Sequence, residues 1–220
     1  MGLNKQTGNM YPFVSHTWNP IRGKCPHNCN YCYMKKFKIG ELRLEKHELN
    51  TQLGNNNKIF VGSSTDMFAE EVPKEWIETV LNFLRNSHEN TYFFQTKNPE
   101  RYTEFLTIFP PDSFLGTTIE TNRNELINSE APNISERVKW MTFITTYPKF
   151  VSIEPIMDFD TPMMTYYIDT IKPKFVSIGA DSKNSNLTEP SITKILQLIR
   201  LLKKKTEVRQ KKNLKRLLKN

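Results

Sequence analysis

The chain has 220 residues, of which 37% are hydrophobic and 25% charged, and its formal net charge is +8. This length suits one domain, and no apolar run approaches the ~20 residues of a membrane-spanning helix, so we expect no membrane partner. The three cysteines are too few, and odd in number, for a disulfide framework, which together with the absence of a targeting segment favours a cytoplasmic location.

The positive charge is concentrated at the C-terminus. Residues 194–220 hold eleven lysines and arginines and a single acid, Glu207, whereas the rest of the chain is close to neutral. We therefore divide the chain into a domain at 1–205 and a basic segment at 206–220. Such a segment would contact the phosphates of nucleic acid or would form a solvated helix face, and both interpretations stay open.

Predicted strands and helices alternate along the chain. Runs of β-branched and aromatic residues predict strands at 13–17, 58–62, 91–96, 114–120, 150–154 and 174–179. Apolar residues at helical spacing, and proline after a capping residue in Asn98-Pro99 and Thr161-Pro162, predict helices at 73–86, 99–108, 134–143, 162–171 and 191–204. A short strand at 207–210 and a short helix at 213–218 follow. This alternation predicts an α/β fold with a parallel sheet.

Polar residues alternate with apolar ones in the later strands. The polar pairs that share a strand face are Gln95 with Lys97, Thr118 with Glu120, Ser152 with Glu154, and Ser177 with Gly179. The apolar faces would meet the helices, so the polar faces would line a wet cavity large enough for a ligand.

All three cysteines lie within eight residues, at Cys25, Cys29 and Cys32, with the spacing C-x3-C-x2-C. Three thiolates on one loop can hold three irons of a cubane cluster and leave the fourth iron open. A zinc site completed by His27 or His16, or three structural thiols, are the alternatives.

With Tyr31 before the last cysteine, this motif resembles the signature of the radical S-adenosylmethionine (SAM) superfamily. The resemblance implies a partial (β/α)6 barrel of the radical SAM type, open on one side, with a basic C-terminal extension. It also implies a 4Fe–4S cluster on Cys25, Cys29 and Cys32, with SAM on the open iron. An external flavodoxin- or ferredoxin-like electron donor would drive cleavage of SAM to a 5′-deoxyadenosyl radical.

The same resemblance implies which residues contact SAM: Tyr31, Gly62, Ser63, Ser64, Asp66, Glu120, Glu154 and Gly179. The segment 62–66 stands where the superfamily has a Gly-Gly-Glu-like sequence, and the two serines depart from that pattern. Glu120 could instead be buried with Lys97 or Arg123. Trp18 would line the cavity or cover its rim. No catalytic residue can be assigned.

Several motifs extend the resemblance beyond the cysteines: T-W-N-P at 17–20, T-K-N-P-E-R at 96–101, I-E-T-N at 119–122, S-I-E-P at 152–155 and I-G-A-D-S at 178–182. In this order they resemble a phage-protein family of radical-SAM-like proteins of undefined substrate. Tyr31-Cys32-Tyr33 is locally similar to the spore photoproduct lyases, radical SAM enzymes of DNA repair, although this chain lacks their additional cysteine.

We therefore expect a radical SAM enzyme whose substrate is unknown, with nucleic acid or a nucleotide as the first candidate because of the basic C-terminus. The alternative is a nucleic-acid-binding module with a structural metal site and no SAM chemistry. Nucleic-acid binding with a steep salt dependence, but without SAM cleavage, would indicate the binding module and not the enzyme.

Overall fold

The structure is a computed structural model that describes residues 3–6, 10–87, 89–183 and 185–219. Asn220, the last residue of the predicted basic segment, lies outside the described residues. Among the described residues, no helix is long and apolar enough to cross a membrane.

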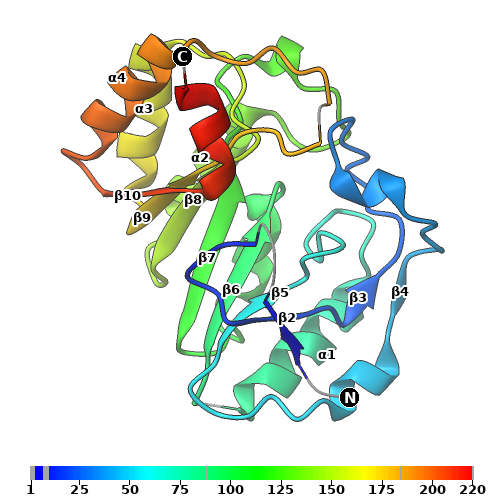
Figure 1. The fold of residues 1–220 in the computed structure, drawn as a ribbon. Helices are drawn as coiled ribbons and strands as arrows, with labels where there is room; N and C mark the ends of the chain where they lie inside the picture. Colours follow the sequence, from blue (N-terminus) through cyan, green and yellow to red (C-terminus); the bar gives the residue numbers. More distant parts are fainter. Residues whose placement is uncertain (1–2, 7–9, 88, 184, 220) are drawn as a thin grey trace.

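An eight-stranded sheet forms the centre of the fold, in the order β1-β2-β5-β6-β7-β8-β9-β10 (Figure 1). Its strands are β1 (Asn4–Lys5), β2 (His16–Trp18), β5 (Lys58–Val61), β6 (Thr91–Thr96), β7 (Ser113–Thr118), β8 (Lys149–Ile153), β9 (Phe175–Ile178) and β10 (Glu207–Gln210). All neighbours pair in parallel except β1 with β2. Within the described part of the chain β1 does not pair with β10, so the sheet is open and no closed barrel is present.

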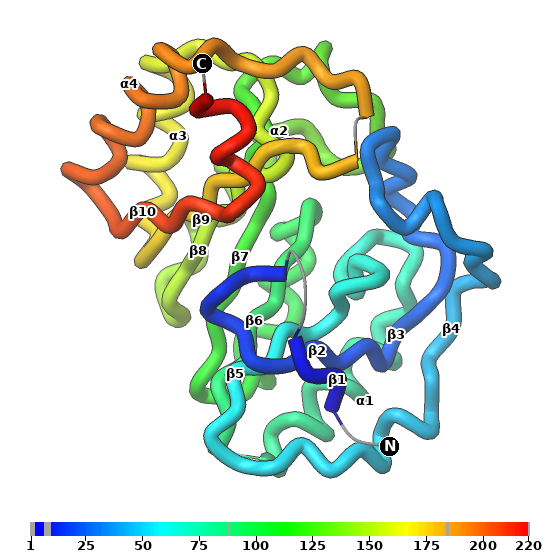
Figure 2. The backbone as a smooth tube through the Cα atoms, viewed as in Figure 1, coloured from blue at the N-terminus to red at the C-terminus, as the bar shows by residue number. Residues whose placement is uncertain are grey.

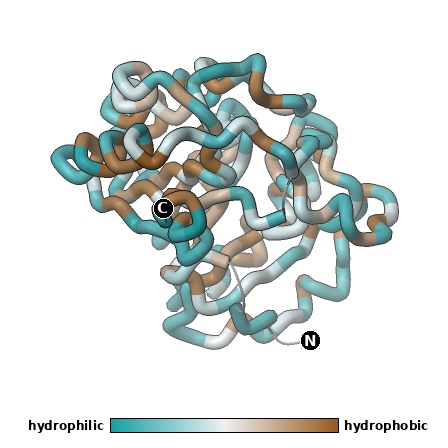
Figure 3. Tube along the Cα trace, turned by 45° about the horizontal axis from the view of Figure 1, so that its top comes forward, coloured by the Kyte–Doolittle hydropathy of each residue, from teal (hydrophilic) through white to brown (hydrophobic). Residues whose placement is uncertain are grey.

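One face of the sheet is covered by four helices. They are α1 (Lys74–Arg85), α2 (Ile134–Phe143), α3 (Thr161–Ile171) and α4 (Ile192–Leu202). Apolar residues such as Val151, Ile153 and Val176 point from the strands into the main core, where they meet one side of each helix. In Figure 3 the tube of the outer helices alternates between teal and brown, as expected for helices with one buried side.

The remaining elements are short. A two-stranded antiparallel ribbon joins β3 (Ile21–Arg22) to β4 (Arg43–Leu44). The 3₁₀ helices are η1 (Tyr33–Lys36), η2 (Lys46–Asn50), η3 (Pro99–Phe105), η4 (Asn124–Leu126) and η5 (Lys212–Leu218). The tube in Figure 2 shows η5, in red, on one side of the molecule and the blue segment that contains the cysteines on the other.

The other face of the sheet has two layers. Near the start of the strands, Phe60, Phe93, Phe150 and Phe175 form a buried aromatic cluster, into which the N-terminal segment inserts Tyr11. Further along each strand the same face becomes polar, because Ser152 lies two residues after Phe150. The prediction of a polar cavity is therefore wrong for the part of this face near the start of the strands, which aromatic rings fill.

Several predicted elements match the structure closely, including β6, α2 and β10. The first strand differs: it was predicted at 13–17 and forms at His16–Trp18, because the ring of Phe13 stacks on Tyr11 with centroids 5.0 Å apart. The sheet also has eight strands where six strands and a short one at 207–210 were predicted, since β1 adds to the edge at β2.

Candidate cofactor site

The three cysteines lie on a loop that follows β3 and leads into η1. All three are free thiols, with Cys29 buried and the other two partly exposed. Two turns shape the loop: Asn28 N–H donates to Cys25 O over 3.2 Å, and Cys32 N–H donates to Cys29 O over 3.1 Å. The sequence thus presents its thiols from one compact loop.

Two observations bear on whether this loop fits an iron–sulfur cluster. The donor chemistry fits, because free thiols on one loop are what such clusters use. The coordination geometry is not formed, because the described residues include no group of three or more histidines, cysteines or acids that could hold a metal ion. Burial, followed by the charge of Asp66, raises the pKa of the Cys25 thiol to about 12, so ligation there must release a proton.

His27 fastens the cysteine loop to the ends of two strands. Its Nε2 lies 2.8 Å from Asp66 Oδ2, which also accepts hydrogen bonds from Thr96 Oγ1 and Lys97 N. Burial by itself would raise the pKa of Asp66, but His27 and the N–H donors outweigh it and hold that pKa below its usual value. The structure therefore places Asp66, a predicted SAM contact, as an anchor of this loop.

Tyr31 provides a second anchor, on Glu120. Its hydroxyl donates to the carboxylate of Glu120, and Lys97 Nζ donates to that hydroxyl over 2.8 Å. Glu120 is fully buried and also pairs with Lys97 and with Arg137 Nη1, the latter over 2.9 Å. Burial would raise the pKa of Glu120, but the two cations lower it to about 2. Glu120 is therefore a buried carboxylate paired with Lys97, which was the alternative to a SAM contact, whereas Arg123 pairs elsewhere, with Asp158 and Asp160.

The loop after β5 is held by the segment that follows β2. Asn19 Oδ1 accepts hydrogen bonds from Ser63 Oγ and Ser64 N, each over 3.0 Å. Gly62 has a φ of 78°, in the left-handed region that glycine favours. Trp18 lies in the main core with its ring 5.3 Å from that of Phe83, so it neither lines the cavity nor covers its rim.

Glu154 lies at the end of β8 with partners from the C-terminal segment. Lys211 Nζ is 2.7 Å from its Oε2, and Asn213 Nδ2 donates to its Oε1 over 3.1 Å. A Cβ at Gly179 would stand 2.7 Å from Glu154 Oε1, so a larger residue at this position would displace the carboxylate. Neither Lys211 nor Asn213 was predicted at the site, because the sequence shows only a charge run there.

A layer of polar side chains lies between Glu120 and Glu154. The hydroxyl of Tyr11 lies 2.8 Å from Gln95 Oε1 and 2.7 Å from Ser152 Oγ. Lys211 Nζ lies 4.6 Å from the centre of the Tyr11 ring, and the pKa of Tyr11 is raised by burial and then by Glu154. Ser177 Oγ is buried without a hydrogen-bond partner among the described residues. Its free hydrogen-bonding capacity suits a polar ligand above the aromatic cluster.

The predicted site residues therefore fall into three neighbouring groups along one edge of the sheet. The cysteine loop joins Tyr31 and Glu120 with Asp66, the 62–64 loop packs on Asn19, and Glu154 with Gly179 meets the C-terminal segment. Among the described residues no hydrogen bond or ion pair joins the first group to Glu154 directly, whereas the pKa of Tyr11 is affected by both Glu154 and Glu120.

Comparison with solved structures identifies the fold. Spore photoproduct lyase with bound AdoMet and dinucleoside spore photoproduct is similar over 93% of this chain and 66% of its own, with a TM-score of 0.61 and 10% identity. The same lyase complexed with the dinucleoside spore photoproduct covers 89% and 64%, with a TM-score of 0.62 and 10% identity. The chain spans about two thirds of the lyase, somewhat less in most of these structures. At this identity the likeness shows the fold alone, which agrees with the superfamily that the cysteine motif resembles.

Sequence comparison adds the family. No curated protein matches this chain. A family model described as "Protein of unknown function (DUF5131)" matches residues 9–182, which include the cysteine loop and every predicted SAM contact. The chain belongs to this family.

Proposed function

We propose that this protein is a radical SAM enzyme whose 4Fe–4S cluster is held by Cys25, Cys29 and Cys32. One observation carries the proposal: three free thiols lie on one loop that His27 and Tyr31 anchor to the ends of β5, β6 and β7, in a fold like that of spore photoproduct lyase. When bound, the cluster would supply the electron that cleaves SAM to a 5′-deoxyadenosyl radical. An external electron donor of the flavodoxin or ferredoxin kind would reduce it.

The residues of the chain would position the reactants. SAM would lie along the carboxyl ends of the strands, near Tyr31, Gly62, Ser63, Ser64, Asp66, Glu120, Glu154 and Gly179. Because protein groups already hold Asp66 and Glu120, these two would act by orienting the loop and by placing the charge of Lys97 beside the cofactor. The aromatic cluster beneath would keep water from entering through the base of the site.

The substrate would enter above the polar layer of Tyr11, Gln95 and Ser152. We place nucleic acid or a nucleotide first among substrate classes, because the basic segment 206–220 supplies cations at this edge. Hydrogen abstraction by an adenosyl radical needs a C–H bond held close to it, so a partly buried polar layer supports orientation of a polar substrate.

Metal analysis tests this proposal directly. Anaerobically reconstituted protein should hold about four iron atoms and as many sulfides per chain, and Cys29→Ala should lose them. The matched control is Asn30→Ala, on the same loop but with an exposed side chain, which should keep its iron. Stoichiometric zinc without iron uptake would instead support the binding module with a structural metal.

A further inference from the structure

The segment that carries the cysteines is itself strongly basic. Between Ile21 and Gly40 the sequence contains no acid. Lys24, Lys35, Lys36 and Lys38 are all exposed, and none of them forms an ion pair within the part of the chain that the structure describes. This charge adds to that of the C-terminal segment and lies on another part of the molecule.

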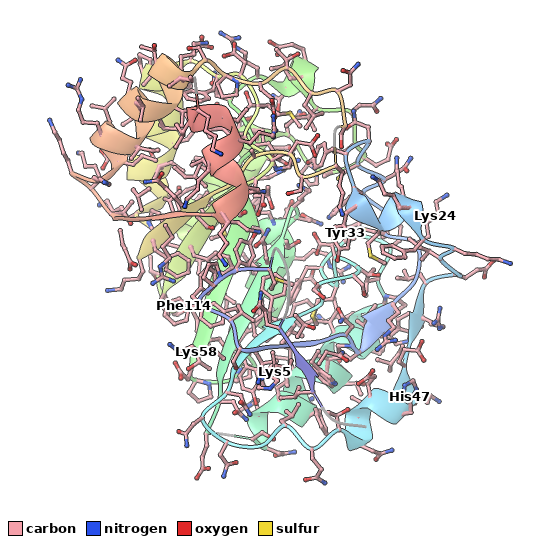
Figure 4. The ribbon with its side chains drawn as sticks, viewed as in Figure 1. Lys5, Lys24, Tyr33, His47, Lys58 and Phe114 are labelled. Carbon is pink, nitrogen blue, oxygen red and sulfur yellow. The ribbon has the colours of Figure 1, made fainter. Side chains whose placement is uncertain are left out.

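Two exposed aromatic rings stand among these lysines. Phe37 is 62% exposed and Tyr33 is 43% exposed, whereas most other phenylalanines are buried. The hydroxyl of Tyr33 donates to Ser63 O over 2.8 Å, which fixes the ring at the end of β5. Figure 4 labels Tyr33 and Lys24 on this flank of the molecule. Alternating lysines and exposed rings are typical of surfaces on which unpaired bases stack.

The C-terminal segment forms a second basic rim. Lys212, Lys215 and Lys219 are exposed and form no ion pairs among the described residues. The segment is firmly attached, because Leu214 is buried in the main core and Lys211 is paired with Glu154. Lys212 and Lys215 therefore project from an anchored η5, and Lys219 directly follows it.

Both rims stand over the same edge of the sheet. Tyr33 fixes the cysteine segment at the end of β5, and Tyr31 fixes it at the end of β7. On the other side, Glu154 after β8 and Ala180 after β9 hold η5 through Lys211 and Asn213. Figure 1 shows the two segments on opposite sides of the upper ends of the central strands. The polar layer of the candidate site lies between them.

We propose that a single-stranded nucleic acid lies across this edge, with its phosphates on the lysines of both rims and an unpaired base stacked on Phe37. Charge complementarity favours a polyanion, and the exposed rings favour unpaired bases over a duplex, whose bases are already stacked. The proposal rests on the proposed function and narrows its substrate class to single-stranded nucleic acid, but its test needs neither iron nor SAM.

Fluorescence anisotropy with the full chain and a labelled oligo-dT tests this proposal. Single-stranded oligo-dT should bind more tightly than a duplex of equal length. Phe37→Ala should weaken binding about 5- to 150-fold, the range for losing one stacked base. Phe143→Ala is the matched control, since it removes an equally exposed ring from α2, and it should leave binding unchanged.

Charge reversal of Lys35, Lys36 and Lys38 tests the phosphate contacts. Each contact adds about 0.7 to the salt slope for a single strand, so the triple variant should lower that slope by about 2. Equal affinities of Phe37→Ala and Phe143→Ala, a preference for duplex, or competition by polyglutamate equal to that by oligo-dT would overturn the proposal. Polyglutamate competition would indicate an acidic protein as the partner. Tight binding without SAM cleavage would keep this proposal and refute the proposed function.

Discussion

The two carboxylates at the edge of the sheet, Glu120 and Glu154, differ in burial and in the origin of their partners. Glu120 is fully buried and paired with Lys97 and with Arg137, which comes from α2. Glu154 keeps 16% of its side chain exposed and meets Lys211 from the last part of the chain. The comparison shows that similar acidic residues at strand ends can serve different purposes: Glu120 fixes the cysteine loop to the fold, whereas Glu154 joins the C-terminal segment to the site.

The largest expected effect comes from Glu120→Gln. Removing this charge leaves Lys97 and the buried Arg137 without their carboxylate, so we expect a loss of about 3–5 kcal/mol in the free energy of unfolding. Urea denaturation measures it, with exposed Glu125→Gln as the control. A loss as small as that of Glu125→Gln would show that Glu120 is not an anchor.

Acid pH should also reveal the difference in stability between the wild type and Glu120→Gln. Because the pKa of Glu120 in the folded protein is about 2, below the value near 4.5 in an unfolded chain, its stabilisation is complete above pH 4.5 and disappears as the pH falls toward 2. Wild-type stability should drop by about 3 kcal/mol more than that of Glu120→Gln across this interval. Parallel pH profiles for the two proteins would contradict the lowered pKa.

Glu154→Gln should cost less, about 2 kcal/mol, since Lys211 loses its charged partner at a site that water still reaches. The double variant Glu154→Gln with Lys211→Met should recover part of this loss. Urea denaturation of the four proteins measures the coupling. If the loss of stability in the double variant equals the sum of the losses in the two single variants, the pair does not hold η5 in place.

Gly179→Ala should have the smallest effect, a loss of about 1 kcal/mol, because the new methyl group would displace the carboxylate of Glu154. Gly40→Ala is the matched control: its Cβ would meet only the end of the Arg43 side chain, at 3.3 Å. Thermal unfolding compares the two variants, and equal stability would show that the contact with Glu154 carries no strain.

The sequence predicted the parts of the site that depend on local patterns. The alternation of polar and apolar residues along the strands correctly placed Thr118 and Ser152 on the face opposite Val151. The cysteine spacing located the cysteine loop. Long-range partners left no such pattern. Lys211 lies 57 residues from Glu154 in the sequence, and within a run of cations its single buried position is invisible.

The aromatic cluster was missed for a related reason. Phe93, Phe150 and Phe175 each lie two residues before a polar residue on the same strand face, so the alternation predicted a wet polar cavity and did not reveal the rings. Tyr11 and Phe13 pack into it from the segment before β2, where the sequence had predicted the start of a strand, and packing of that kind depends on the whole sheet.

SAM cleavage tests the central claim most directly. Anaerobically reconstituted protein, given dithionite and SAM, should release 5′-deoxyadenosine and methionine, and Cys29→Ala should release neither, while Asn30→Ala behaves as wild type. Iron-loaded protein that releases no 5′-deoxyadenosine under these conditions would contradict the assignment of this chain as a radical SAM enzyme.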